Sequence, residues 1–199
     1  MAKMIGVQNS AFVKSCELLA QAPMPDRVEI AFLGRSNVGK SSLINLLLRA
    51  KLAKSSATPG KTRLINFYST DLIKDALKIP LFLVDLPGFG YAKVSKSEQQ
   101  KWQENLLLFC KKRSNIKLFC LLIDSRHMDL ELDKEVFTFF NSIILGDQKI
   151  IKIYTKIDKL KKAQISDLKA KNALLGSNAR GFSENSFKQI WEGIFKAIF

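Results

Sequence analysis

Histidine, cysteine and acidic residues are all scarce in this chain of 199 residues. The single histidine, His127, excludes a metal site built from several histidines. The three cysteines are widely spaced and form no CxxC or Cys/His cluster, so the pattern indicates neither a zinc site nor a disulfide framework. Cys110 and Cys120 lie in apolar runs and are expected to be reduced core residues.

Long apolar runs are missing as well. No stretch approaches the roughly twenty apolar residues that a membrane-spanning helix needs, and the N-terminus lacks the charged-then-apolar pattern of a secretory signal. We therefore expect a cytoplasmic protein without a membrane span, and a monomer. Its length and its 47% hydrophobic residues fit a single domain over residues 1–199, with 1–26 as an N-terminal extension and 27–199 as the core.

The few acidic residues leave a strongly basic chain. Lysine and arginine number 32 against 18 acidic residues, which gives a net charge of +14. Such an excess is typical of proteins that contact a polyanion, and RNA is the natural candidate for a cytoplasmic protein. A lysine-rich surface that merely reflects genome composition is the alternative.

Residues 34–41 form one complete motif, GRSNVGKS. It follows an apolar run at 28–33 and precedes another at 43–48. A buried strand, a glycine turn and a helix N-terminus in this order predict a phosphate-binding P-loop. The glycines let successive backbone N–H groups point at one anion, Lys40 supplies a cation for the outer phosphates, and the Ser41 hydroxyl can ligate magnesium. The predicted phosphate contacts are Gly34, Arg35, Ser36, Asn37, Val38, Gly39, Lys40 and Ser41.

Strands and helices are expected to alternate along the rest of the chain. This alternation predicts an α/β P-loop NTPase with a mostly parallel six-stranded sheet and helices on both faces. In such sheets ligands bind outside the carboxyl ends of the strands. Residues 1–26 are expected to hold only a short amphipathic helix that ends before Pro23. Strands are expected near 27–33, 64–69, 79–85, 116–123, 149–154 and 173–175, and helices near 39–50, from 95 or 97, 129–144, 159–171 and 183–199.

Two segments have the character of nucleotide-sensing loops. The small, polar and basic stretch 51–63 follows the first helix, and its Thr62 is favoured over Thr58 as the hydroxyl that reaches magnesium and the terminal phosphate. The strand expected at 79–85 ends in a DxxG motif, in which Asp85 can hold the water shell of the metal and the Gly88 N–H can approach the γ-phosphate. The predicted contacts are Gly60, Lys61, Thr62, Arg63, Leu64, Asp85, Leu86, Pro87 and Gly88; the predicted metal ligands are Ser41, Thr62 and Asp85, and the catalytic candidates Lys40, Thr62 and Gly88.

The TKID motif selects the base. A carboxylate at Asp158 can accept two hydrogen bonds from guanine N1–H and the N2 amine, an arrangement that adenine does not offer. The stem of Lys156 can lie along the base and ribose. GTP is thus favoured over ATP, with Thr155, Lys156, Ile157 and Asp158 as contacts. A surface KxD in a lysine-rich region is the alternative reading.

These motifs resemble those of the EngB (YihA/YsxC) group of translation-factor-related, Era-like GTPases. The resemblance covers nearly the whole chain and rests on GRSNVGKSSLIN, TPGKTR followed by NFY, DLPGFGYAKV, DSRH and TKID. It implies magnesium held at Ser41 and Thr62, and a role in assembly of the large ribosomal subunit and in normal cell division and septation. Its partners would be rRNA and ribosomal proteins. The last guanine-contacting loop, placed at Gly176, Ser177 and Asn178, departs from the usual pattern of relatives.

Hydrolysis is expected to be slow. Many GTPases carry a glutamine after DxxG that orients the attacking water, whereas this chain has Phe89. The water could instead be positioned by the backbone, by a potassium ion for which Asn37 is a candidate ligand, or by a ribosomal partner. A P-loop kinase or ATP-driven enzyme is disfavoured by TKID, and an RNA-binding module with a vestigial nucleotide site by the intact motif residues.

Arg126 and His127 are expected to form a structural turn, with His127 and Asp133 capping and steadying the helix that follows. The basic helix from Lys159 to Lys171 is a candidate rRNA-facing surface, with a solvated face as the alternative.

Overall fold

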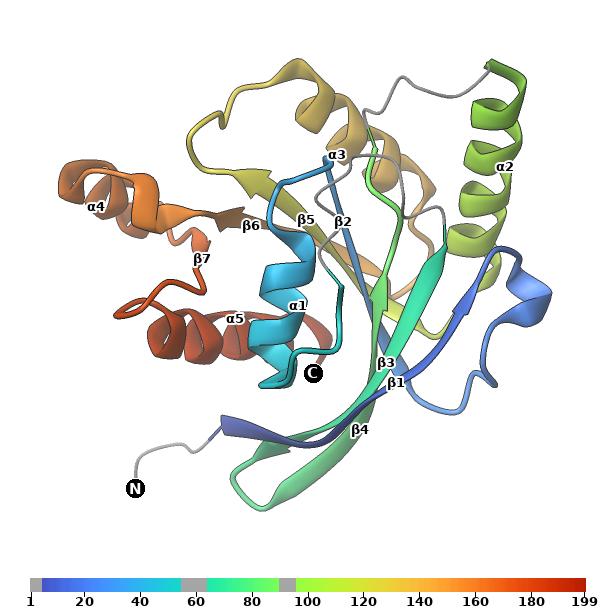
Figure 1. Ribbon diagram of the computed structural model, residues 1–199, viewed down its shortest axis with the longest axis horizontal. Helices are drawn as coiled ribbons and strands as arrows, with labels where there is room; N and C mark the ends of the chain where they lie inside the picture. Colours follow the sequence, from blue (N-terminus) through green and yellow to red (C-terminus); the bar gives the residue numbers. More distant parts are fainter. Residues whose placement is uncertain (1–4, 55–63, 90–95) are drawn as a thin grey trace.

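The computed structural model describes residues 5–54, 64–89 and 96–199, with the backbone alone for 96–103 (Figure 1). Within these residues seven strands form one sheet in the order β1-β3-β4-β2-β5-β6-β7. The strands are β1 (Ile5–Cys16), β2 (Val28–Gly34), β3 (Ile65–Lys74), β4 (Leu77–Asp85), β5 (Ile116–Asp124), β6 (Lys149–Thr155) and β7 (Leu174–Gly176). The helices are η1 (Leu19–Gln21), α1 (Lys40–Leu48), α2 (Lys96–Lys112), α3 (Glu131–Ile143), η2 (Ile157–Lys159), α4 (Lys162–Ala170) and α5 (Ser183–Ile198).

The middle of the sheet is parallel. Strands β4, β2, β5, β6 and β7 run in the same direction, while β3 is antiparallel to both β4 and β1. Central parallel strands are buried on both faces and therefore read as continuous apolar runs; Ile30 to Leu33 in β2 are at most 1% exposed. The parallel strands end at one edge, which carries Gly34, Asp85, Asp124 and Thr155.

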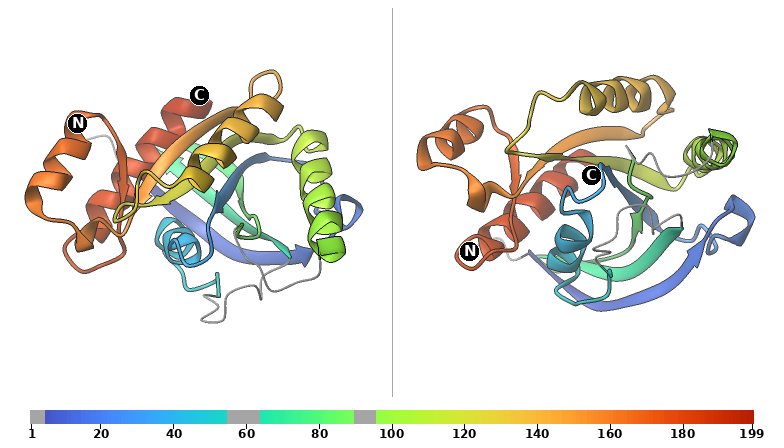
Figure 2. Two further views of the ribbon diagram at one scale, coloured as in Figure 1. Left: turned by 90° about the horizontal axis from the view of Figure 1, so that it is seen from above. Right: turned by 45° about the horizontal axis from the view of Figure 1, so that its top comes forward.

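Helices cover both faces of the sheet. Ile30 and Phe32 face a core that includes α1 and α5, among whose members is the fully buried Trp191. Ala31 and Leu33 face a second core formed with α2 and α3. Alternate residues of a strand point to opposite faces, so one strand supplies both cores. The views in Figure 2 show α1 and α5 on one side and α4 at the far end of the sheet, beyond β7. The α/β architecture expected from the sequence is confirmed.

The strand number and the N-terminal segment were predicted wrongly. Residues 5–16 form β1, not a helix, and pair antiparallel with β3, so the sheet has seven strands instead of six. As an edge strand, β1 buries only Ile5 and Cys16. Two irregularities in its register and the positive φ of Asn9 (54°) break the period-two pattern that would have revealed a strand.

Smaller differences concern the ends of elements. Strand β3 continues through Asp71 and turns at Asp75 (φ 54°), beyond the expected end at residue 69. Helix α1 stops at Leu48 because Arg49 adopts a left-handed conformation. Helix α3 begins at Glu131, two residues after the expected start at 129, and Leu130 just before it is 39% exposed. Ser95, one of the two expected starts of α2, lies outside the described residues.

Two predictions, on the cysteines and on membrane-spanning helices, can be compared with the structure directly. Cys110 and Cys120 are free and buried, as predicted, and Cys16 is buried with them. None of the helices that the structure describes combines the length and apolar content needed to span a bilayer.

Candidate nucleotide-binding site

The P-loop connects β2 to α1 and needs both of its glycines. A Cβ on Gly34 would lie 2.9 Å from Val38 Cγ1 and 3.1 Å from the Leu122 carbonyl oxygen, so a side chain there would force the loop open. Gly39 has φ 103° and precedes the first residue of α1, a backbone conformation that glycine adopts at no steric cost. The free N–H groups at this helix N-terminus and the helix dipole make a ready anion site.

The DxxG segment is paired directly with the P-loop. The Phe89 N–H donates to the Gly34 carbonyl at 3.3 Å, and the Ser36 N–H donates to the Phe89 carbonyl at 3.4 Å. Between these contacts, a Cβ on Gly88 would come within 3.2 Å of Ser36 Oγ and 3.3 Å of Ser36 N. Gly88 therefore lies in close contact with the P-loop, where a larger residue would crowd Ser36.

The lysine of the P-loop contacts the aspartate of DxxG. Lys40 Nζ forms an ion pair with Oδ1 of Asp85, whose carboxylate is only 4% exposed. Together with the Ser41 hydroxyl at the start of α1, this carboxylate provides the hard oxygen donors that magnesium prefers, the remaining ligands usually being phosphate and water. Within the part of the chain that the structure describes, no cluster of three acidic, cysteine or histidine residues forms a metal cage. The donors present fit Mg²⁺ held largely by a nucleotide; Thr62 lies outside the described residues.

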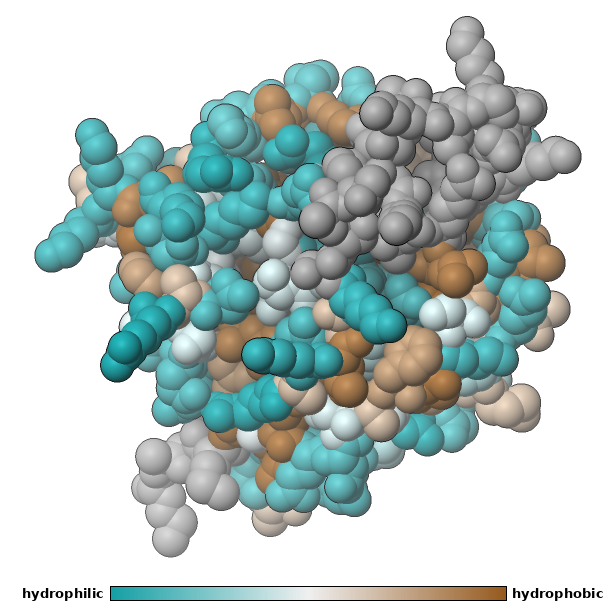
Figure 3. All heavy atoms as spheres, in the orientation of Figure 1, coloured by the Kyte–Doolittle hydropathy of each residue, from teal (hydrophilic) through white to brown (hydrophobic). Residues whose placement is uncertain are grey.

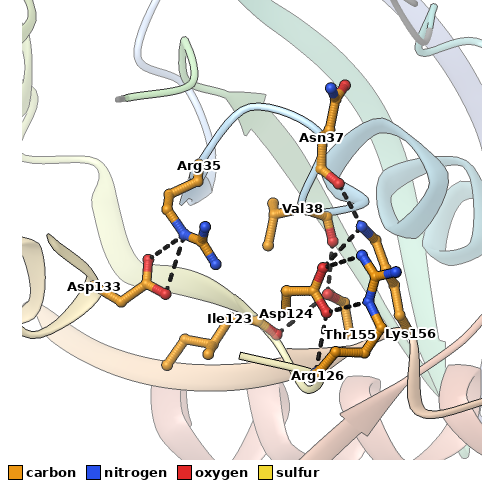
Figure 4. A network of polar contacts seen from close by, with 9 residues as sticks. All are labelled: Arg35, Asn37, Val38, Ile123, Asp124, Arg126, Asp133, Thr155 and Lys156. Atoms are coloured by element: carbon orange, nitrogen blue, oxygen red, sulfur yellow. Dashed lines mark hydrogen bonds and ion pairs between the residues drawn. The ribbon is translucent and has the colours of Figure 1, made fainter. Parts of the chain in front are cut away.

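The TKID loop is docked on the P-loop by two side chains (Figure 4). The Thr155 hydroxyl donates to the Val38 carbonyl at 2.6 Å. Lys156 Nζ donates to the Asn37 carbonyl at 2.6 Å and to Oδ2 of Asp124 at 2.9 Å. The predicted base loop and the predicted phosphate loop are therefore one hydrogen-bonded unit.

Asp158 and the loop after β7 also meet. The Ser177 hydroxyl donates to Asp158 Oδ1 at 2.6 Å, and Lys159 Nζ lies 3.4 Å from Oδ2. Burial acts to raise the pKa of Asp158, but the hydrogen bonds from Ser177 and Lys159 outweigh it and lower the pKa. The group is thus an ionised acceptor at neutral pH. It is held by Ser177, which follows Gly176 at the end of β7 and precedes the exposed Asn178.

Comparison with known proteins identifies the protein family. A family model described as "50S ribosome-binding GTPase" matches residues 29–156. A "Probable GTP-binding protein EngB" of Wolinella succinogenes is 54% identical over 158 residues, which cover 79% of this chain and 79% of that protein. One from Campylobacter lari is 53% identical over 177 residues, covering 87% and 89%.

The chain belongs to the EngB family of GTP-binding proteins. It is a GTPase and binds guanine nucleotide, and the resemblance seen in its motifs is confirmed. A crystal structure of a probable GTP-binding protein engB superposes with a TM-score of 0.55 at 23% identity, covering 86% of this chain and 98% of the other. Era in complex with MgGDPNP and a segment of 16S ribosomal RNA superposes with a TM-score of 0.63 at 22% identity, covering 87% and 57%. At these identities the likeness shows the fold, which is that of the P-loop GTPases.

Within this EngB-family site, some predicted contacts can act only through their backbone. The side chains of Val38, Leu86 and Ile157 are at most 5% exposed and belong to the cores. Pro87 is buried as well, whereas Leu64 is 40% exposed just before β3. Gly60, Lys61, Thr62 and Arg63 lie outside the described residues.

Two carboxylates at this rim form ion pairs that the sequence did not predict. Asp133, 2% exposed, accepts from Nε of Arg35 at 3.0 and 3.2 Å, which ties the P-loop to α3. Burial raises the pKa of Asp133, and the nearby Arg35 opposes that shift. The helix cap expected from His127 and Asp133 is wrong, because Leu130 precedes α3 without a side-chain cap. Asp133 lies in the first turn of α3 and pairs with Arg35. An acidic residue on the apolar face of a predicted helix was the available signal.

Asp124 is the second carboxylate. It ends β5 and is 5% exposed. Besides Lys156 it binds Arg126, for which the sequence suggested only a turn.

Proposed function

We propose that this GTPase is a molecular switch in the assembly of the large ribosomal subunit and, through that process, in normal cell division and septation. The observation that carries the switch is the pairing of Gly34 and Ser36 with Phe89, which leaves Gly88 in contact with the P-loop. A γ-phosphate beside Gly88 would contact both loops at once. In switch GTPases, such contacts with the γ-phosphate order the loops, and hydrolysis releases them. The family membership sets aside the P-loop kinase and the vestigial RNA-binding module.

The proposed roles follow from the positions of the residues. Lys40 and the backbone N–H groups from Gly34 to Ser41 would bind the phosphates, and Ser41, Thr62 and Asp85 would hold Mg²⁺. Magnesium, when bound, neutralises charge that develops on the phosphates. The Gly88 N–H would orient the γ-phosphate, and Asp158, with Lys156 and Ser177, would bind the guanine.

Unaided hydrolysis is proposed to be slow. The side chain of Phe89 packs with the second core and lines an apolar pocket of about 450 Å³ between α2 and α3. It offers no polar atom to orient a water molecule. The Asn37 side chain points away from the polar network in Figure 4 and is the candidate ligand for a potassium ion. Potassium, the backbone or a ribosomal partner would then position the water.

The ribosomal partner is supported by charge and by the family. The net charge is +14, and the description of the matching family model includes ribosome binding. Hydrophilic side chains project from the surface over α4 in Figure 3. The exposed lysines there are Lys159, Lys161, Lys162, Lys169 and Lys171. We propose that these lysines face rRNA, and that the protein is cytoplasmic and monomeric.

Co-sedimentation with purified large ribosomal subunits tests this proposal. We expect binding with a non-hydrolysable GTP analogue, weaker binding with GDP, and a GTPase rate that rises when subunits are added. Replacing Lys161, Lys162 and Lys169 together by Glu should reduce binding at least tenfold, because each lost phosphate contact weakens the interaction.

The matched control replaces three exposed lysines elsewhere by Glu, which changes the net charge equally: Lys14, Lys188 and Lys196. This control should retain binding. Equal loss in both triple variants would contradict a specific α4 surface, and equal binding with GDP and the GTP analogue would contradict the switch.

A further inference from the structure

Asp124 is the centre of a charged network behind the TKID loop (Figure 4). Its Oδ1 accepts from Nε of Arg126 at 3.0 Å and from the Arg126 backbone N–H at 3.1 Å. Its Oδ2 accepts from Nη2 of Arg126 at 2.7 Å and from Nζ of Lys156 at 2.9 Å. Arg126 thus grips the carboxylate with two parallel hydrogen bonds, which fix the plane of the carboxylate as well as its charge.

Lys156 depends on this network for its conformation. It has φ 58°, a left-handed conformation that side-chain-bearing residues adopt uncommonly and that neighbouring contacts must hold. Its ammonium is fixed at two points, the Asn37 carbonyl on the P-loop and Asp124 at the end of β5. Its stem therefore spans from the TKID loop to the P-loop in a defined path.

The balance of charge shows what Asp124 contributes. Two cations, Arg126 and Lys156, share this one carboxylate. Without its negative charge, the Lys156 ammonium would keep only the neutral Asn37 carbonyl and would meet the like charge of Arg126. The long lysine side chain would then gain rotamer freedom and leave its fixed path.

We infer that Asp124 and Arg126 are positioning residues that hold Lys156 in the pose in which its stem contacts the nucleotide base. Asp124 supplies the charge and Arg126 fixes the orientation of the carboxylate. The inference rests on the proposed contact between Lys156 and the base. Through Lys156, the pair sets the affinity for purine nucleotides without reading the identity of the base, which is the proposed task of Asp158.

A double-mutant cycle on the full chain tests the inference. Dissociation constants for GDP and IDP are measured for the wild type, Asp124→Asn, Lys156→Ala and the double variant, with thermal unfolding as a check of folding. Asp124→Asn should weaken GDP binding about tenfold, the worth of one charge-assisted hydrogen bond. IDP binding should weaken by the same factor, because inosine lacks only the N2 amine. In the Lys156→Ala background, Asp124→Asn should change affinity less than twofold, since residues that act as a unit are not additive.

Two further variants guard the interpretation. Asp147→Asn removes a carboxylate that pairs with Lys117 near the other end of β5, and it should leave both affinities unchanged. Arg126→Gln changes a side chain that is 44% exposed, so it keeps the test decisive even if Asp124→Asn does not fold. We expect it to weaken GDP and IDP binding two- to threefold, again only when Lys156 is present.

The outcomes separate the inference from the function on which it rests. If Lys156→Ala leaves GDP affinity unchanged, the proposed base contact is wrong. If Lys156→Ala weakens binding while Asp124→Asn and Arg126→Gln do not, the base contact stands and the positioning inference alone is overturned. A full Asp124→Asn effect in the Lys156→Ala background would also overturn it.

Discussion

A buried carboxylate meets an arginine at each end of the parallel strands. At the amino end, Glu29 is 0% exposed and accepts from Nε and Nη2 of Arg113 at 2.6–3.0 Å. Arg113 also donates to the Pro23 carbonyl at 2.8 Å and is itself buried. At the carboxyl end, Asp124 binds both Arg126 and Lys156, and the Arg126 side chain is 44% exposed.

The two carboxylates differ in the direction in which their pKa is shifted from the ordinary value. Burial raises the pKa of Glu29, and the hydrogen bonds from Arg113 only partly offset it. Burial also acts on Asp124, but the hydrogen bonds from Arg126 and Lys156 outweigh it and hold its pKa well below the ordinary range. The amino end therefore carries a buried pair that joins β2 to the segment just after α2. At the carboxyl end two cations, Arg126 and Lys156, share the single negative charge of Asp124. The remaining positive charge suits an edge that receives an anionic ligand.

The largest expected effect breaks the carboxyl end alone. Asp158→Asn replaces an acceptor by an amide. Guanine would then lose the two charge-assisted hydrogen bonds proposed for Asp158, of about 1.5–3 kcal/mol each, and xanthine would gain a complementary partner. We expect the preference for GDP over XDP to fall by roughly two to four orders of magnitude, with unfolding nearly unchanged. Competition binding with both nucleotides measures this, with the exposed Asp167→Asn as control. Retained guanine selectivity would contradict the role of Asp158.

Next in size is a change at the amino end. Arg113→Ala leaves Glu29 buried without its partner, which should lower the free energy of unfolding by about 3–5 kcal/mol. GDP affinity of the folded protein should change less than twofold. Urea unfolding without nucleotide measures the first quantity and titration at low temperature the second.

The control for Arg113→Ala is Lys117→Ala, which breaks the more exposed pair with Asp147. That change should cost at most about 1 kcal/mol. The comparison between the ends of the sheet fails if Arg113→Ala weakens GDP binding tenfold.

Gly34→Ala should lower the free energy of unfolding less than Arg113→Ala does. The added Cβ would sit 2.9 Å from Val38 Cγ1 and 3.1 Å from the Leu122 carbonyl, and overpacking of this kind costs about 1–3 kcal/mol. Because the strain falls on the phosphate loop, GDP and GTP-analogue affinities should drop together, by about tenfold. Gly6→Ala is the matched control, since its Cβ would meet nothing within 4 Å. An affinity equal to that of the control would show that the loop adapts.

The smallest effect is the pH dependence of stability, which should have opposite sign at the two ends. The folded pKa of Asp124 lies below its ordinary 3.8, so its contribution is present above that pH and is lost only as the pH falls further. The folded pKa of Glu29 lies above its ordinary 4.5, so the native state loses stability as the pH rises through that window.

Urea titrations between pH 3 and 7 on Asp124→Asn and Glu29→Gln, each compared with the wild type, separate the two signs. The wild-type advantage over Asp124→Asn should shrink only toward the acid end. The advantage over Glu29→Gln should decline as the pH rises above 4.5. Parallel curves for both variants would show that the two carboxylates are alike.

Local backbone requirements explain what the sequence could predict. A P-loop needs Gly34 and Gly39 at fixed spacing, and strands buried on both faces appear as apolar runs, so the core strands and the three motifs were recognisable. Strand β1 was missed because it is exposed and pairs with a distant partner. The Asp124–Lys156 and Arg35–Asp133 contacts join residues 32 and 98 positions apart, and side-chain meetings at such separations depend on the completed tertiary structure.

The three buried cysteines can report where the folded protein opens locally. Burial raises the pKa of Cys16, of Cys120 and of Cys110, the last to about 12. Since only a thiolate reacts with an electrophile, each cysteine can be labelled only when its own element opens. Cys16 lies on the edge strand β1, Cys110 on α2 beside the DxxG segment, and Cys120 in the central strand β5. The order in which they are labelled therefore records, without any substitution, the order in which the edge, the α2 face and the centre of the molecule come apart.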